Sequence, residues 1–222
     1  MISFNLNGKT CPAYLSPSIQ GSGPGVIVIQ EYWGLVDHIK HIADRFAEAG
    51  FTALAPDFYL GQKAEKPDEA GRLMMALNID QAEKIVGGAV DALLTHEATS
   101  SKRVGVVGFC MGGQLSLYAA SVNSNIGACV DYYGVHPNVT PQFETLQAPI
   151  LGFFAEHDAH VNASVVRSLS QKLKSFGKQH EFITYPNTHH AFFNETRPEV
   201  YNQQASEDSW KRMVDFFHKH LS

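Results

Sequence analysis

Residues 103–114, "RVGVVGFCMGGQ", run from an apolar segment into a turn that holds a cysteine among glycines. The apolar part is typical of a strand buried on both faces of a sheet, and the small residues after it are typical of a closely packed helix. A Gly-x-Cys-x-Gly turn between a strand and a helix is the pattern of a nucleophile elbow. It predicts that Cys110 is a nucleophile; the alternative is a buried structural cysteine, which is common for this residue type.

The glycines around Cys110 have a physical reason if the turn is an elbow. A nucleophile on so sharp a turn is expected to have a positive φ, so its neighbours must be small. Gly108 and Gly112 remove side chains that would collide, and Gly113 lets the helix approach the strand. The turn also places the sulfur at a helix N-terminus, where the helix dipole favours a thiolate over a thiol.

Outward from this turn, apolar strand-like runs alternate with helix-like segments along the whole sequence. This alternation predicts an α/β fold with a mostly parallel central sheet and helices on both faces, as one domain over residues 1–222. Asp37 and Asn162 are expected to cap two of the helices. The expected strands are 2–6, 11–15 (paired antiparallel with the first), 25–30, 51–56, 103–109, 128–134, 149–156 and 180–186. The expected helices are 37–50, a stretch of about 67–95 with interruptions whose places the pair Gly87-Gly88 leaves open, 111–121, 162–177 and a last one from 203 onward.

The composition is that of a globular protein, with 44% hydrophobic and 18% charged residues in a chain of 222. The net charge of −5, without a lysine- or arginine-rich run, argues against nucleic acid or an anionic membrane surface as a partner. The apolar runs are too short to span a membrane, and the first residues lack the pattern of a secretory signal. Three widely spaced cysteines do not form a disulfide framework, so we expect a cytoplasmic location.

Two later strands end in loops that carry acids and histidines. The segment 150–161, "ILGFFAEHDAHV", supplies an acid, and the segment 182–194, "FITYPNTHHAFFN", supplies a base. The order nucleophile, acid, histidine, each after a strand, is that of the catalytic triad in α/β-hydrolases. We predict that Asp158 is the acid and His190 the base, with Glu156 and His189 as alternatives.

Several motifs together resemble the dienelactone hydrolase family, a branch of the α/β-hydrolases with a cysteine nucleophile. The resemblance runs from about Gly25 to the C-terminus, and it implies the α/β-hydrolase fold. The motifs that carry it are "VIVIQEYWG" (26–34), "GFCMGG" (108–113), "DYYGV" (131–135), "AEHDAHV" (155–161) and "THHAFFN" (188–194).

The resemblance implies roles for further residues. Cys110, Asp158 and His190 match the family's nucleophile, acid and base, and Glu31 matches a glutamate that contacts the nucleophile's thiol. The oxyanion hole would consist of the backbone N–H groups of Met111 and Tyr32. Trp33, Tyr133 and Phe192 are candidates for substrate contact, with core packing as the alternative for such aromatic residues.

The residues that bind substrate in the family are not matched in this chain. Family members that hydrolyse dienelactone hold its carboxylate with arginines, one of which follows the catalytic histidine closely. At that place this chain has Asn194, with Arg197 a little beyond. Arg72 and Lys66 lie in the segment 64–77 that would cover the site, and Lys63 directly precedes it, but none of them aligns convincingly. The resemblance therefore transfers the catalytic groups but not the substrate.

The expected activity is hydrolysis of an activated ester or lactone through an acyl-cysteine, with a small molecule as substrate. The alternatives are an acyltransferase or thioesterase on the same triad and a non-catalytic lactone-binding protein; a redox protein would require a second cysteine nearby. No cofactor and no metal are expected, because the histidine pairs 38/41 and 157/160 lack the further ligands of a zinc site. The sequence leaves open whether the protein is a monomer or a homodimer.

Overall fold

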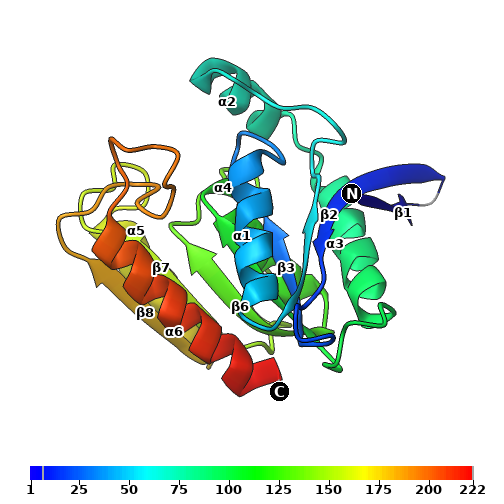
Figure 1. The fold of residues 1–222 in the computed structure, drawn as a ribbon. Coiled ribbons are helices and arrows are strands. Elements are labelled where there is room, and N and C mark those ends of the chain that lie inside the picture. Colours follow the sequence, from blue (N-terminus) through cyan, green and yellow to red (C-terminus); the bar gives the residue numbers. More distant parts are fainter. Residues whose placement is uncertain (7, 222) are drawn as a thin grey trace.

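The computed structural model describes residues 1–6 and 8–221, and its strands form one eight-stranded sheet (Figure 1). The strands are ordered β1-β2-β4-β3-β5-β6-β7-β8 across it. The pairs β1–β2 and β2–β4 are antiparallel, and all other neighbours are parallel. The strands are β1 (Ile2–Leu6), β2 (Lys9–Ser16), β3 (Gly25–Ile29), β4 (Thr52–Pro56), β5 (Val104–Phe109), β6 (Ile126–Tyr132), β7 (Ile150–Ala155) and β8 (His180–Tyr185).

Helices cover both faces of this sheet, which confirms the predicted α/β architecture. In Figure 1, α1 and α6 lie in front of the sheet, while α3 and α4 pack on the opposite face. The helix α2 lies apart from the sheet, beyond the C-terminal ends of the parallel strands. The helices are α1 (Asp37–Glu48), α2 (Pro67–Met75), α3 (Ile79–Leu94), α4 (Met111–Val122), α5 (Ala163–Ser175) and α6 (Gln203–Leu221).

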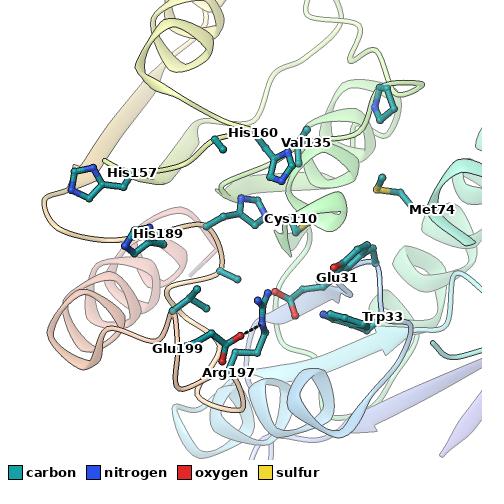
Figure 2. Close-up of a pocket in the computed structure, with 16 residues that line it drawn as sticks. Glu31, Trp33, Met74, Cys110, Val135, His157, His160, His189, Arg197 and Glu199 are labelled. Atoms are coloured by element: carbon teal, nitrogen blue, oxygen red, sulfur yellow. Dashed lines mark hydrogen bonds and ion pairs between the residues drawn. The ribbon is translucent and has the colours of Figure 1, made fainter. Parts of the chain in front are cut away.

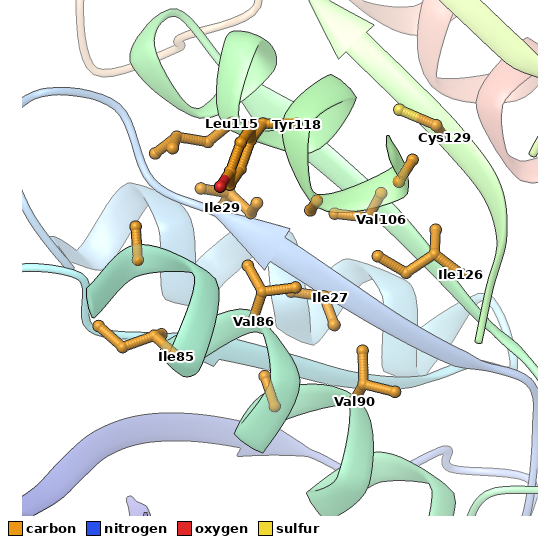
Figure 3. Packing of buried hydrophobic residues seen from close by; sticks show 14 of the residues in the cluster. Ile27, Ile29, Ile85, Val86, Val90, Val106, Leu115, Tyr118, Ile126 and Cys129 are labelled. Atoms are coloured by element: carbon orange, nitrogen blue, oxygen red, sulfur yellow. The ribbon is translucent and has the colours of Figure 1, made fainter. Parts of the chain in front are cut away.

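The strand β3 shows why its sequence is continuously apolar. Ile27 and Ile29 face a core cluster formed with α3 and α4, whereas Val26 and Val28 face a second cluster formed with α1 and α6. Figure 3 shows Ile27 and Ile29 against the side chains of α3 and α4. All five residues of β3 are buried, because successive side chains point to opposite faces and helices cover both.

One local expectation is wrong, and one left open by the sequence is decided. The residue before α1 is Val36, which makes no side-chain cap, and Asp37 is instead the first helical residue, with its carboxylate bonded to Lys40 at 2.8 Å. The helical stretch expected at about 67–95 is interrupted at residues 76–78, and Gly87 and Gly88 are both inside α3. Within the described residues, the helices are all too short or too polar to cross a membrane.

Candidate active site

Cys110 lies at the junction of β5 and α4 with the backbone conformation predicted for an elbow. Its φ is 54° and its ψ is −118°, and it occupies the N-cap position of α4. Its N–H donates to the carbonyl of Tyr132 at 3.0 Å, and its carbonyl accepts from the N–H groups of Gly113 and Val135. These bonds hold a conformation that L-residues rarely adopt. The residue is 9% exposed, and this exposure is to a cavity.

The glycines next to Cys110 are needed because the backbones of three elements meet here. A Cβ on Gly108 would overlap the carbonyl oxygen of Gly112. A Cβ on Gly112 would lie 2.5 Å from the carbonyl oxygens of both Ile29 and Gln30, at the end of β3. A Cβ on Gly113 would overlap the carboxylate of Asp131 in β6. The close approach of α4 to β3 and β6 therefore depends on all three glycines.

Asp158 and His190 lie together although 32 residues separate them in sequence. His190 Nδ1 is 2.6 Å from Asp158 Oδ2, while Asp158 Oδ1 accepts the backbone N–H groups of His160 and Val161 at 2.8 and 2.9 Å. Burial raises the pKa of Asp158, but these bonds outweigh it, and the pKa is below its usual value. The carboxylate is therefore ionised and fixes the orientation of the imidazole.

The imidazole of His190 interacts with Asp158 on one side and with the Cys110 thiol on the other. Burial disfavours the imidazolium, yet the hydrogen bonds to Asp158 and Cys110 outweigh this effect and raise the pKa of His190 to about 10. Nδ1 is engaged by Asp158, so Nε2 is the nitrogen available to the sulfur. A protonated imidazole beside a thiol favours the thiolate.

The alternative acid and base have other surroundings. Glu156 is exposed, and its Oε2 accepts the N–H of Asn187 at 2.8 Å. His189 is exposed, and its ring lies 5.5 Å from that of His157 at the mouth of the cavity. The geometry therefore joins Asp158, rather than Glu156, to His190.

Glu31 follows β3 and lies in the same cavity as Cys110, with 2% of its surface exposed. Its Oε2 accepts from Asn194 Nδ2 at 2.8 Å. Asn194 Oδ1 in turn accepts the N–H and hydroxyl of Thr196, which fixes the orientation of the amide. Asn194 thus binds Glu31 and is not free to bind a substrate carboxylate.

The residues expected to form the oxyanion hole are Met111, which directly follows Cys110, and Tyr32, which lines the same cavity. Met111 is the first residue of α4, so its N–H has no acceptor within the helix. Tyr32 follows Glu31 after the end of β3, and its side chain lines the cavity. Burial and the proximity of Cys110 raise the pKa of the Tyr32 hydroxyl, so this side chain remains neutral.

A cavity of about 630 Å³ surrounds Cys110 at the C-terminal ends of the parallel strands. Figure 2 shows Cys110 near its centre, with Glu31 and Trp33 on one side and His157 and His189 on the opposite side. Arg197 reaches the cavity as well, and its Nε donates to Glu199 at 2.9 Å. Within the described residues, no three His, Cys, Asp or Glu side chains are grouped so that they could hold a metal ion.

Two of the three aromatic residues considered for substrate contact lie elsewhere. Trp33 lines the cavity, but Tyr133 and Phe192 are fully buried and do not. The ring of Tyr133 packs against His190 at 4.9 Å and against Phe192 at 5.4 Å. Tyr133 therefore packs directly against the imidazole, and Phe192 packs against Tyr133.

Other cavity residues were not singled out from the sequence as parts of the site. Met74 and Pro137 come from segments without a recognisable motif, and only the folded chain brings them to Cys110. The "AEHDAHV" motif did contain His160, whose ring lies 5.6 Å from that of His190. His160 follows Asp158 by two residues, and this short spacing indicates that both lie in the loop after β7.

The sheet topology and the elbow define this chain as an α/β-hydrolase. A model of the dienelactone hydrolase family matches residues 12–221. The protein "usf" of Aquifex pyrophilus is 40% identical over 230 residues, which cover 100% of this chain and 99% of the relative. A protein of Aquifex aeolicus provisionally named a carboxymethylenebutenolidase is 34% identical over 228 residues, with 100% and 98% covered.

Solved structures agree with these sequence relatives. A crystal structure from Klebsiella pneumoniae, provisionally titled a dienelactone hydrolase, superposes with a TM-score of 0.88 at 26% identity. The match covers 99% of this chain and 98% of the other. The chain belongs to the dienelactone hydrolase family, whose members act on small-molecule esters, and it is a hydrolase of this type.

Proposed function

We propose that this enzyme hydrolyses activated esters or lactones with a Cys110–His190–Asp158 triad and an acyl-cysteine intermediate. The single observation that carries the proposal is the placement of the Cys110 sulfur next to an imidazole that is itself bonded to Asp158 at 2.6 Å. The strained backbone of Cys110 and its position at a helix N-terminus support the same role.

In the first step the Cys110 thiolate attacks the substrate carbonyl carbon. The developing oxyanion accepts hydrogen bonds from the backbone N–H groups of Met111 and Tyr32. The carbon–oxygen bond to the leaving group then breaks, and His190 gives its proton to that oxygen. Glu31 lies close enough to share the cavity with the thiol, and we assign it to receive the thiol proton when the sulfur is not already ionised.

In the second step water attacks the acyl-cysteine. The acylated sulfur carries no charge, so one of the causes that raised the pKa of His190 is gone. The imidazole can then act as a general base while Asp158 keeps it oriented. The acid leaves with the thiolate restored and His190 protonated again; where Glu31 had received the thiol proton, it gives that proton back to the Cys110 sulfur.

The sulfur nucleophile limits the substrates. In the tetrahedral intermediate a thiolate leaves more readily than an ordinary alkoxide, so attack on a simple alkyl ester tends to revert. Enol-lactones, aryl esters and thioesters have stable leaving groups and are expected to react, whereas amides are expected to be poor substrates.

Three free cysteines support a cytoplasmic location for this reaction.

The test uses aryl esters with the wild type, Cys110→Ala and Cys110→Ser. Cys110→Ala should have no activity above background, and Cys110→Ser should be much weaker than wild type because oxygen lacks the low pKa of sulfur. Mass spectrometry after rapid quenching should find the acyl group on the peptide that contains Cys110. Full activity of Cys110→Ala would refute the proposal.

A further inference from the structure

The cavity around Cys110 has two chemically different sides. His157, His160, His189, Arg197 and Glu199 line it from the loops that follow β7 and β8. Trp33, Met74, Val135 and Pro137 line it from the loop after β3, from α2 and from the loop after β6. The sheet order, in which β3 and β8 are separated by β5, β6 and β7, keeps Trp33 and His189 at opposite ends of the cavity. Val135, which follows β6, lies beside His160, where the two sides meet (Figure 2). Figure 2 shows Met74 and Trp33 on the side of Cys110 opposite His157 and His189.

The helix α2 reaches the cavity through Met74. Ala70 is its single buried residue, while Leu73 and Met74 pack partly against the core. The next residue, Met75, is 52% exposed and does not line the cavity. Met74 and Met75 therefore have the same chemistry at adjacent positions, but Met74 alone contacts the site.

His136 fixes the end of α2 against the loop after β6. Its Nδ1 accepts the N–H of Asn138 at 3.1 Å, so its Nε2 carries the proton and donates to the carbonyl of Met74 at 3.1 Å. Burial lowers the pKa of His136, with the bond to Met74 opposing the effect, and the ring stays neutral. This neutral bridge connects Met74 to the segment that supplies Val135 and Pro137.

Among the charged side chains of the cavity, Glu31 and Arg197 lie near Trp33, and Met74 lies apart from them (Figure 2). Apart from the histidines, the one basic side chain among the described residues that line the cavity is Arg197. It comes from the loop after β8, where it is paired with Glu199. The charged group at the end of β3 is the Glu31 carboxyl. A substrate carboxylate against Met74, Val135 and Pro137 would lose its hydration, because none of these three side chains is a cation or a hydrogen-bond donor, and it would share the cavity with the Glu31 carboxyl.

We propose that Trp33, Met74, Val135 and Pro137 form an apolar subsite that binds an uncharged hydrophobic group of the substrate, of about the size of a benzyl group. This proposal rests on the proposed function and assigns its substrate class as esters or thioesters with such a group, rather than anionic lactones. Met74 determines specificity, and His136 is a positioning residue that acts through Met74.

The first test labels Cys110 and requires no ester hydrolysis. Methyl and benzyl methanethiosulfonate are both uncharged; the thiolate attacks the sulfenyl sulfur, a mixed disulfide forms, and methanesulfinate leaves. Cys11 and Cys129 are 0% exposed, and burial raises the pKa of both thiols, so labelling reports on Cys110. The measured quantity is the benzyl-to-methyl ratio of labelling rates, relative to the same ratio for N-acetylcysteine.

The wild-type ratio should exceed that of N-acetylcysteine, and Met74→Glu should lower it about tenfold because the benzyl group would meet a charge. Met75→Glu is the matched control and should leave the ratio unchanged. His136→Ala should lower the ratio, whereas His136→Gln should keep it, since an amide can both accept from Asn138 and donate to Met74. An equal ratio in wild type and Met74→Glu would overturn the proposal.

The second test compares p-nitrophenyl acetate, p-nitrophenyl phenylacetate and the anionic mono-p-nitrophenyl succinate. The wild type should have its highest kcat/KM for the phenylacetate, and Met74→Glu should lose this preference mainly through KM. A wild-type preference for the succinate would overturn the subsite. If no ester is hydrolysed by Cys110 but the labelling ratio responds to Met74→Glu, the proposed function fails and the subsite stands.

Discussion

At the scale of single residues, the backbone of Cys110 stores strain that its surroundings maintain. A φ of 54° with a ψ of −118° is unfavourable for a residue with a Cβ. Three backbone hydrogen bonds, to Tyr132, Gly113 and Val135, hold it there. The strain is useful if the sulfur must project from the turn, because a relaxed cysteine would direct its side chain into the sheet.

Gly112→Ala tests how closely the elbow is packed. The added Cβ would lie 2.5 Å from two carbonyl oxygens of the backbone, which cannot rotate away as a side chain could. We expect the free energy of unfolding to fall by about 1–3 kcal/mol and aryl-ester hydrolysis to be lost. Urea denaturation and kcat/KM measure the two effects.

Gly71→Ala is the control for this substitution, since nothing lies within 4 Å of the Cβ it would add. It should not reduce the unfolding free energy or the activity. Equal behaviour of the two variants would mean that the contact at Gly112 relaxes without consequence.

Asp158→Asn tests the orientation of the imidazole. The amide nitrogen would face His190 Nδ1 and favour the tautomer with the proton on Nε2, so the base could no longer accept a proton there. We expect kcat to fall on the order of 10³-fold with little change in KM. The pKa of His190 should also return towards its ordinary value, which NMR titration can follow. An unchanged kcat would show that His190 does not depend on Asp158.

The sequence predicted these residue positions because each follows a strand in a recognisable motif. It could not separate Trp33 from Tyr133 and Phe192, since all three are aromatic residues near strand ends. The difference arises from the turn of each loop, which directs Trp33 to the cavity and the other two into the core. In the sequence, Asn194 stands out only because it occupies the place of an arginine of the family. Its hydrogen bond to Glu31 could not be predicted, because it joins residues 163 positions apart.

At the scale of elements, α3 shows that a glycine pair need not interrupt a helix. Nothing lies within 4 Å of a Cβ added to Gly87. A Cβ on Gly88 would lie 2.6 Å from the ring of Phe4 in β1. Gly88 therefore permits β1 to pack on α3, whereas Gly87 has no such contact.

Gly87→Ala should consequently stabilise the protein more than Gly88→Ala does. Alanine at position 87 should raise the free energy of unfolding by about 0.5–1 kcal/mol, because it restricts the unfolded chain and favours the helix. Alanine at position 88 should give less stabilisation or a loss, since Phe4 must move. Urea denaturation measures both; a larger gain at position 88 than at position 87 would contradict the packing argument.

Element types were predictable here where the apolar period was clear, and cap positions were less so. Asn162 does cap α5 and accepts the N–H groups of Ser164 and Val165. From the sequence, Asp37 is as good a cap candidate as Asn162. In the structure its carboxylate is bonded to Lys40, and Asp37 is already the first residue of α1 rather than its cap. A side chain with two local partners available cannot be assigned from the sequence alone.

At the scale of the whole molecule, the parallel strands bring distant segments to one edge of the sheet. Glu31 follows β3 and Cys110 follows β5, while Asp158 follows β7 and His190 follows β8. One core cluster on each face of the sheet holds these strands in place. The alternation of strands and helices predicted this convergence. The sequence indicated a covering segment here, but it could not predict how α2 is fixed, because the carbonyl of Met74 is bonded to His136, 62 residues later in the chain.

The same close packing buries a carboxyl group that has no role in the proposed reaction. Asp131 lies in β6 against Gly113 and Gly134, and neither of its oxygens makes a side-chain hydrogen bond. Burial raises the pKa of Asp131 to about 7, from an ordinary value of 3.8. The folded protein therefore retains a proton here that the unfolded chain releases.

The sign of the resulting pH dependence follows from the two pKa values. Below pH 3.8 the Asp131 carboxyl is protonated in both the folded and the unfolded state, so it causes no loss of stability there. Between pH 3.8 and about 7 the unfolded state ionises first, so the free energy of unfolding falls as the pH rises. The total loss is about 4 kcal/mol at most, from about 1.4 kcal/mol for each pKa unit.

Asp131→Asn removes this titration with little change in volume. The variant should gain stability relative to wild type as the pH rises from 4 to 8, and the difference in unfolding free energy should level off above about pH 7. Asp208→Asn is the control, because bonds to Tyr185 and Arg212 lower the pKa of Asp208 and confine its effect to acid pH. Urea denaturation at four or five pH values gives both differences. Parallel pH curves for wild type and Asp131→Asn would mean that the buried carboxyl ionises as easily as in water, and hence that β6 and α4 leave room for water between them.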